Sequence, residues 1–120
     1  MDINNPVIQL CMEGTRAEFE HKKEEARALY QQAWEIHTND YEACIAAHYL
    51  ARFQKSPEDT LHWNLTALNH ANAVHDKSVE SFFPSLYLNL GHSYETLGDQ
   101  AESKKYYQLA ADLGVVHQAD

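Results

Sequence analysis

The sequence of this 120-residue chain repeats, which limits the folds open to it. A shift of 77 residues aligns like residues near both ends of the chain, namely Gly14 with Gly91, Glu18 with Glu95, Glu25 with Glu102, Tyr30 with Tyr107, Gln31 with Gln108 and Ala33 with Ala110. A shift of 34 residues aligns the first copy with a middle one, namely Ala17 with Ala51, Phe19 with Phe53 and Ala33 with Ala67. Such periods are typical of stacked units that need their neighbours to bury an apolar face.

The middle copy differs from the other two. It has His48 where the others have glycine, Asn64 where they have tyrosine, and Thr60 at a position that is otherwise small. It lies 43 rather than 34 residues before the third copy, so nine residues are inserted, which we place between Ala67 and Pro84. The middle copy is therefore the one whose structure the repeat predicts least well.

Each copy is expected to form two helices, because start and end signals fall at matching places. Asn5-Pro6 suits a helix cap and first turn, and Gly98-Asp99 can end one helix and start the next. Asn39-Asp40-Tyr41-Glu42 and Ser56-Pro57-Glu58-Asp59 read as capping boxes. The sequence predicts no strand and six helices, at residues 6–20, 23–37, 40–54, 57–74, 82–97 and 99–113.

The third copy carries a family pattern. It reads Tyr87-x-x-Leu90-Gly91-x-x-Tyr94-x-x-x-Gly98, followed by Ser103-x-x-x-Tyr107-x-x-Ala110. This pattern resembles the tetratricopeptide repeat (TPR), and the first two copies fit it more loosely. The resemblance covers residues 7–114 and implies a small, bacterial-type protein with one all-α domain. Its fold would be a short right-handed superhelix of six antiparallel helices, with repeats at about 7–40, 41–83 with the insertion, and 84–117.

Charge and cysteine content limit the partners and the compartment. Nine basic and eighteen acidic residues give a formal net charge of −9, which nucleic acids and anionic membranes would repel. Cys11 and Cys44 are too few for a disulfide framework, and neither a signal peptide nor a membrane helix is recognisable. We therefore expect a single cytoplasmic domain over residues 1–120, with reduced thiols and no nucleic-acid or membrane partner.

Eight histidines raise the possibility of a metal site, but their spacing argues against one. The sequence has no His-Glu-x-x-His motif and no histidine pair four residues apart. Cys44 and His48 share a helix face, but two ligands do not make a site. His62, His70 and His75 are expected on the surface, where protonation near pH 6 would change their charge.

Signatures of catalysis are also missing from the sequence. It contains neither a phosphate-binding glycine loop nor a Gly-x-Ser-x-Gly motif, and no feature marks a cysteine as activated. The prediction is a protein that is not an enzyme and that needs no cofactor or metal. A small histidine-based metal protein or enzyme stays open as the less favoured alternative.

The family resemblance implies a groove lined by the first helix of each repeat, with the second helices forming the outer face. In this register the groove residues would be Cys11, Thr15, Glu18, Phe19, Ile45, Tyr49, Arg52, Phe53, Leu88, His92, Glu95 and Thr96. For the aromatic residues Phe19, Tyr49 and Phe53 a second interpretation remains open, in which they belong to the core.

The groove composition bears on the partner. Family members that hold the acidic tail of heat-shock chaperones resemble one another in a groove of lysines, arginines and asparagines. Here the corresponding places hold Cys11, Thr15, Ile45 and His92, and only Arg52 is cationic, so carboxylates would lack charge-assisted partners. We predict an adaptor that binds a helix or an extended peptide of neutral to basic character through shape and aromatic contact.

The end of the array suggests a second role. Too few residues follow the last predicted helix to form a covering helix. We therefore expect an open apolar face of Tyr106, Leu109 and Leu113, with Val115 and Val116 beside it. Such a face favours a two-fold homodimer, and a purely structural oligomerisation unit is the alternative function.

Overall fold

The computed structural model describes residues 3–114 and contains only helices and connecting segments over that range. The α-helices are α1 (Pro6–Phe19), α2 (Lys23–Ile36), α3 (Asp40–Leu50), α4 (Pro57–Ala73), α5 (Phe83–Thr96) and α6 (Gln100–Asp112), with short 3₁₀ helices η1 (Ala51–Phe53) and η2 (Glu80–Phe82). The prediction of an all-α chain with six helices is confirmed.

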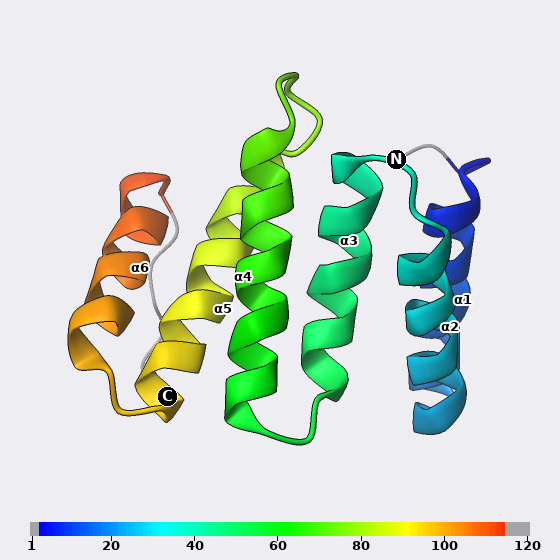
Figure 1. Ribbon diagram of the computed structural model, residues 1–120, viewed down its shortest axis with the longest axis horizontal. Helices are drawn as coiled ribbons and strands as arrows, with labels where there is room; N and C mark the ends of the chain where they lie inside the picture. Colours follow the sequence, from blue (N-terminus) through cyan, green and yellow to red (C-terminus); the bar gives the residue numbers. More distant parts are fainter. Residues whose placement is uncertain (1–2, 115–120) are drawn as a thin grey trace.

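The helices pack as three successive pairs, α1 with α2, α3 with α4 and α5 with α6. Figure 1 shows the first pair at one end of the molecule, the third at the other end and α3 and α4 between them. The principal-axis extents of 38 × 33 × 21 Å are those of a flattened, elongated body. Arranged in this way, each pair buries its apolar face against its neighbours along the chain.

Four helix starts are capped by side chains, as the sequence predicts. The Asn5 side-chain oxygen accepts from the backbone N–H of Val7 at 2.8 Å, and Asn39, Ser56 and Asp99 accept from the N–H three residues ahead. These bonds satisfy N–H groups that a helix leaves without partners. The largest departure from the predicted ends is at α3, which stops at Leu50 and continues as the 3₁₀ helix η1.

The turn between α1 and α2 forms without a glycine. His21 adopts a φ of 62°, and the N–H of Lys22 donates to the carbonyl of Ala17 at 2.8 Å. At the matching turn of the third pair, Gly98 takes a φ of 82° and the N–H of Asp99 donates to the carbonyl of Tyr94 at 2.9 Å. The same turn is therefore built twice, once with the residue that suits a left-handed backbone and once with a histidine.

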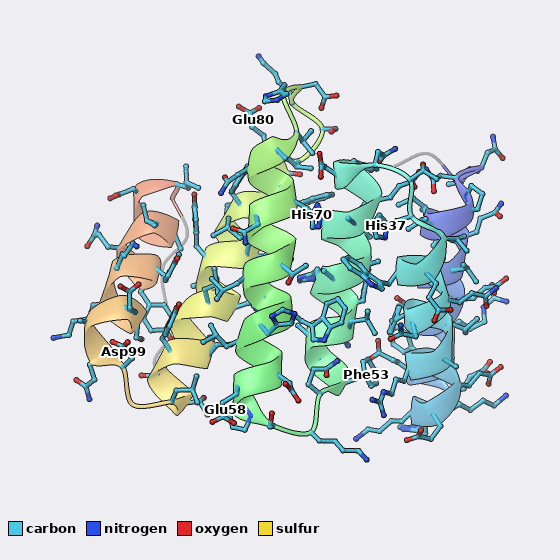
Figure 2. The ribbon with its side chains drawn as sticks, viewed as in Figure 1. His37, Phe53, Glu58, His70, Glu80 and Asp99 are labelled. Carbon is cyan, nitrogen blue, oxygen red and sulfur yellow. The ribbon has the colours of Figure 1, made fainter. Side chains whose placement is uncertain are left out.

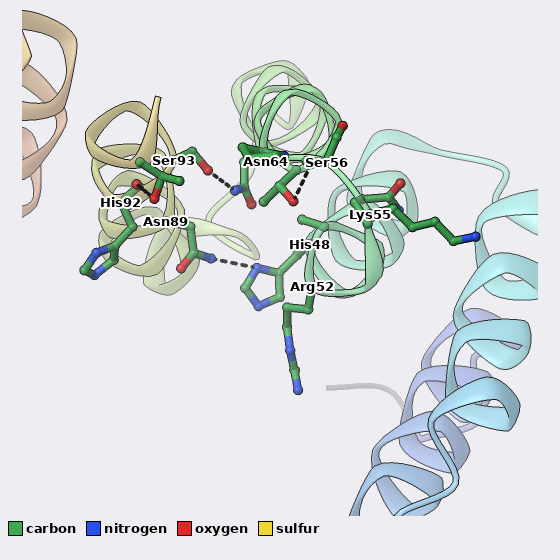
Figure 3. Close-up of a pocket in the computed structure, with 13 residues that line it drawn as sticks. His48, Arg52, Lys55, Ser56, Asn64, Asn89, His92 and Ser93 are labelled. Carbon is green, nitrogen blue, oxygen red and sulfur yellow. Dashed lines mark hydrogen bonds between the residues drawn. The ribbon is translucent and has the colours of Figure 1, made fainter. Parts of the chain in front are cut away.

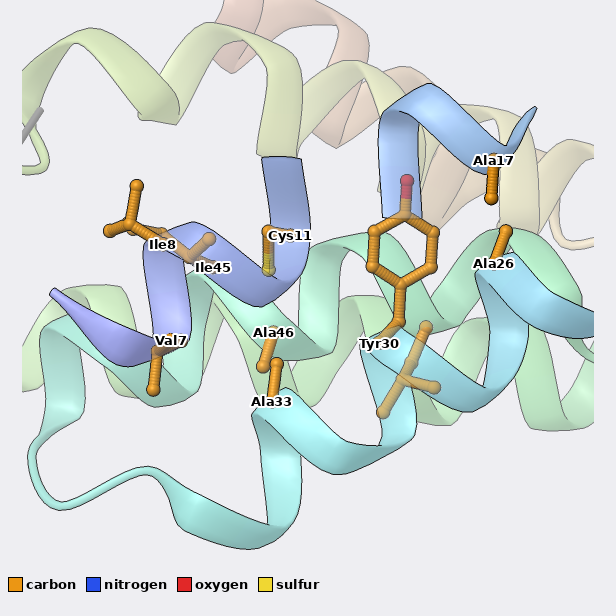
Figure 4. Close-up of a cluster of buried hydrophobic side chains, with 10 residues drawn as sticks. Val7, Ile8, Cys11, Ala17, Ala26, Tyr30, Ala33, Ile45 and Ala46 are labelled. Atoms are coloured by element: carbon orange, nitrogen blue, oxygen red, sulfur yellow. The ribbon is translucent and has the colours of Figure 1, made fainter. Parts of the chain in front are cut away.

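Glycine and tyrosine set the spacing within the first and third pairs. A Cβ atom on Gly14 would lie 2.5 Å from a ring carbon of Tyr30, and one on Gly91 would lie 2.5 Å from the ring of Tyr107. Only glycine leaves room for the ring at these positions. Figure 4 shows Tyr30 in a core cluster that also contains small side chains, including Ala17, Ala26, Ala33 and Ala46.

The insertion lengthens the second pair. Helix α4 runs for 17 residues, and residues 74–79 together with η2 connect it to α5. This is the interval in which the sequence predicts nine extra residues. Besides its partner α6, helix α5 packs against α4, and this placement shapes the site described below.

Candidate functional site

Four hollows lie along α1, α3 and α5, the first helices of the three pairs. Two lie between α1 and α3, one of about 320 Å³ beside Met12 and Ile45 and one of about 370 Å³ beside Phe19 and Arg52. Two others lie between α3 and α5, of about 140 Å³ and about 530 Å³. Tyr49 lines three of these four hollows. Tyr49 is therefore the side chain that these hollows share most often.

The first junction, where the first helix pair meets α3, is filled by aromatic rings. Tyr30 stacks on Tyr49 with ring centroids 4.7 Å apart and lies 5.5 Å from the Phe53 ring. The Tyr30 hydroxyl donates to the Glu18 carboxylate at 2.5 Å. Burial, together with that hydrogen bond, raises the pKa of Tyr30 well above its usual value. Arg52 forms an ion pair with the same carboxylate, so Glu18 is bound from both sides.

The second junction, where the second helix pair meets α5, has a different construction. Asn64 is buried, and its side-chain amide donates to the Ser93 hydroxyl at 2.8 Å. The Asn89 amide lies 3.4 Å from Nδ1 of His48, which joins α3 to α5. Around these side chains lies the cavity of about 530 Å³. Figure 3 shows Asn64, Ser93, His48 and Asn89 arranged around it, with two of the hydrogen bonds drawn.

His48 is neutral near pH 7. Burial lowers its pKa, and the nearby Arg52 guanidinium lowers the pKa further. Because the Asn89 amide is a donor, Nδ1 of His48 accepts, and the proton of the neutral ring sits on Nε2. The second junction therefore offers uncharged hydrogen-bonding groups rather than a buried charge.

Most of the predicted groove residues line the four hollows, but three do not. Cys11, Thr15, Phe19, Ile45, Tyr49, Arg52, His92 and Thr96 line at least one hollow, as does Glu18. Phe53, Leu88 and Glu95 line none of these hollows in the part of the chain that the structure describes. Phe53 packs on Tyr30 in the core, and the Glu95 carboxylate accepts from the Tyr107 hydroxyl at 2.9 Å.

The α5 residues differ from the prediction because α5 presents another face to the cavity. The Asn64–Ser93 bond turns Ser93 and Asn89 toward the second pair. Leu88 lies on a neighbouring face of the same helix and is half-buried. At the first junction the matching positions, Ala46 and Leu50, belong to the core cluster that contains Tyr30. Because the second junction has no tyrosine there, Asn89 and Ser93 line a cavity instead.

The predicted open face at the end of the array is partly covered by the chain itself. Tyr106 is only 8% exposed and stacks on Tyr94 with ring centroids 5.7 Å apart. Leu109 is half-buried, whereas Leu113 is 54% exposed. Val115 and Val116 lie outside the described residues.

The outer face, formed by the second helices, holds aromatic and histidine side chains. Trp34 and Trp63 meet edge to face at 4.9 Å and pack against the core. Figure 2 labels His37 and His70 on the visible side of the molecule. His70 is half-buried rather than a free surface residue, and its Nδ1 lies 2.7 Å from an oxygen of Asp40. These contacts hold α2, α3 and α4 together.

Neither a metal site nor an activated thiol is found among residues 3–114. No group of three or more histidine, cysteine, aspartate or glutamate side chains could hold a metal ion there. Burial raises the pKa of Cys11 to about 12 and that of Cys44 to about 11, so both stay protonated thiols at neutral pH.

The sequence did not predict three features of this groove. They are the buried Asn64–Ser93 hydrogen bond, the Asn89–His48 hydrogen bond and the exposed side chain of Met12. The divergence of the middle copy was the available signal. Polar residues at positions that are otherwise glycine and tyrosine already indicated that the aromatic packing of the other copies would be missing there.

Comparison with known proteins identifies one segment. A family model described as tetratricopeptide repeat matches residues 84–113, which hold all but the first residue of α5 together with α6. No curated protein matched the chain, and no solved structure did either. None of the helices in residues 3–114 is long and apolar enough to cross a membrane.

Proposed function

We propose that this chain is a cytoplasmic, non-enzymatic protein-binding module that holds a peptide segment of a partner in the groove formed by α1, α3 and α5. The matched repeat family supports this, since its repeats generally act as protein-binding scaffolds rather than catalysts. The three helix pairs extend the same construction along the described chain. The proposal concerns the groove, because that is where the fold leaves hollows beside large exposed side chains.

One observation carries the proposal: Phe19 is 83% exposed and Met12 is 55% exposed, and both border hollows that Tyr49 also lines. The fold does not use either side chain for its own packing. Removing apolar surface from water favours association, and exposed apolar groups beside a concave surface mark interaction sites. A partner that covers them would gain most of its affinity there.

Charge supports a partner of neutral to basic character. The chain has a net charge of −9. Arg52 is bound by Glu18, so its charge is already balanced. A strongly acidic segment would approach against the field of the whole molecule.

The test is a pull-down with the double variant Met12→Ala, Phe19→Ser. Both residues are exposed, so melting should stay at the wild-type value while affinity for the captured partner falls about tenfold or more, equivalent to ~1.4 kcal/mol. The matched control is Ile36→Ala, an exposed apolar residue on the outer helix α2. A partner that binds the double variant as well as it binds wild type would contradict the proposal.

A structural role through self-association is the second candidate. Leu113 is exposed at the end of α6 and could join a two-fold contact. The burial of Tyr106 leaves less apolar area for this purpose than the sequence predicts. Light scattering that gives a mass of 13.8 kDa at high micromolar concentration would rule the role out, and a mass twice as large would support it.

A further inference from the structure

The residues of the second junction can be aligned with those of the first by the repeat, but the aromatic side chains are not retained. The first junction is filled by Tyr30, Tyr49 and Phe53, and the matching positions of the second junction are occupied by Asn64, His92 and Thr96. All three of the latter line the cavity of about 530 Å³. The cavity therefore lies where the other junction holds a tyrosine against its neighbours.

We propose that this cavity receives a tyrosine side chain of the partner protein, which takes the place that Tyr30 occupies at the first junction. The inference rests on the proposed function and names the anchor of the bound segment. Tyrosine is a frequent anchor in protein interfaces because it combines a large apolar ring with a polar tip. The cavity offers surfaces for both parts.

The apolar part of the cavity suits a ring. Ala51 and Pro57 contribute apolar walls, one from the end of α3 and one from the start of α4. Ala67, which matches the core residues Ala33 and Ala110 of the other pairs, is fully buried like them. The second pair thus keeps the buried alanine of the other pairs but not their tyrosine.

The polar part of the cavity suits a neutral hydroxyl better than a carboxylate. Asn64, Asn89 and Ser93 supply amide and hydroxyl groups, which can both donate and accept. Of the cations in the lining, Arg52 is paired with Glu18, and Figure 3 shows Lys55 extending away from the cavity. A buried carboxylate without a cationic partner is costly, whereas a phenol hydroxyl needs only hydrogen-bonding groups.

The direct test uses p-cresol, the side chain of tyrosine as a free molecule, with the full-length ¹⁵N-labelled chain. We expect saturable shifts of the Asn64 and Asn89 side-chain amide signals with a dissociation constant of about 1–10 mM, as for a fragment. Toluene, which lacks the hydroxyl, should bind several-fold more weakly. Absence of saturable shifts with p-cresol, equal binding of toluene, or binding of acetate in place of p-cresol would each overturn the proposal.

Variants that fill the cavity sharpen the test. Asn64→Tyr combined with His48→Gly restores the pairing of the other two helix pairs and should abolish the p-cresol shifts. If that double variant does not fold, Thr96→Phe fills the cavity from an exposed position that matches Phe53 and should weaken p-cresol about tenfold. Asn69→Tyr, on the exposed side of α4, is the matched control and should leave binding unchanged.

The two proposals fail in different ways. If Met12→Ala, Phe19→Ser releases the partner but Thr96→Phe does not, the groove binds protein and the tyrosine anchor is wrong. If p-cresol binds as expected while the Met12 and Phe19 double variant keeps the partner, the cavity is a real phenol site and the proposed groove function is wrong.

Discussion

The two junctions of this array share one register and differ in what fills them. At the first, Tyr30 and Tyr49 stack at 4.7 Å. At the second, Asn64 stands in the place of the tyrosine beside a cavity of about 530 Å³. Both pairs keep a fully buried alanine at the helix contact, Ala33 in the first and Ala67 in the second. The buried alanine is thus common to both pairs, whereas the aromatic position fills the first junction and leaves the second open.

The residues of the second junction differ from those of the first in charge as well as in side-chain volume. Where the first pair has Glu18 as the acceptor for a tyrosine hydroxyl, the middle copy has Arg52, and Arg52 binds back to Glu18. His48, at the position of the glycines, is held neutral. Three substitutions thus accompany the change from a packed junction to a polar cavity in whose lining Arg52 is already paired with Glu18.

The sharpest test of this comparison removes the key residue from each junction. Tyr30→Ala should lower the free energy of unfolding by about 3–5 kcal/mol, because it empties a fully buried ring position. Asn64→Ala should cost only about 1–3 kcal/mol, since it leaves the Ser93 hydroxyl without its partner. Urea unfolding of both variants measures the difference. Equal losses would mean that the second junction is as tightly packed as the first.

A smaller effect should follow from adding one methyl group at the glycine position. Gly14→Ala places a Cβ 2.5 Å from the Tyr30 ring, and such overpacking costs about 1–3 kcal/mol despite the better helix propensity of alanine. Gly98→Ala, whose Cβ would meet nothing within 4 Å but whose φ is 82°, tests backbone strain without overpacking and should cost about 1 kcal/mol. Thermal melting distinguishes them, and a stabilised Gly14→Ala protein would show that the ring can move aside.

Much of the fold follows from local patterns in the sequence, which explains why it was predictable. Helix starts depend on residues such as Asn5 and Asn39, whose side chains cap the next turn. The spacing of glycine and tyrosine in the sequence indicates where two neighbouring helices approach closely. These signals lie within one pair, so the sequence shows them directly.

The cavity depends on contacts between helix pairs, so it could not be predicted from local sequence patterns. The position of α5 follows from the insertion after α4 and from the bond between Asn64 and Ser93, which are 29 residues apart. The burial of Tyr106 against Tyr94 lies within the third pair, but no spacing pattern in the sequence marks that contact. The repeat register indicates which positions are equivalent, but whether such a position is packed or lines a cavity depends on the side chains that meet it from the neighbouring pair.

The junctions should also differ in their response to acid. The folded-state pKa of His48 is lowered, so the unfolded chain binds its proton more readily, and the contribution of the neutral ring is lost as pH falls below the ordinary value of about 6.5. At the first junction the pKa of Tyr30 is raised, so the hydroxyl stays protonated and is insensitive to acid.

Unfolding free energies at about pH 7.5 and about pH 5.5 test this difference. Wild type should lose more stability over this range than His48→Gln, which removes the buried imidazole from the second junction. His75→Gln, in the exposed segment after α4, is the control and should behave like wild type. If the His48→Gln protein keeps the full pH dependence, the neutral imidazole at the second junction is not its source.

The smallest effect concerns the turns that close the first and third pairs. His21 holds a φ of 62° where Gly98 serves the third pair, and a non-glycine residue in this region carries about 1–2 kcal/mol of strain. His21→Gly should therefore raise the free energy of unfolding by about 0.5–1 kcal/mol, the relief exceeding the added entropy of the unfolded chain. His75→Gly, at a position without a positive φ, should lower stability instead. If the melting temperatures of both variants shift in the same direction, the histidine in the α1–α2 turn carries no more strain than the glycine in the matching turn.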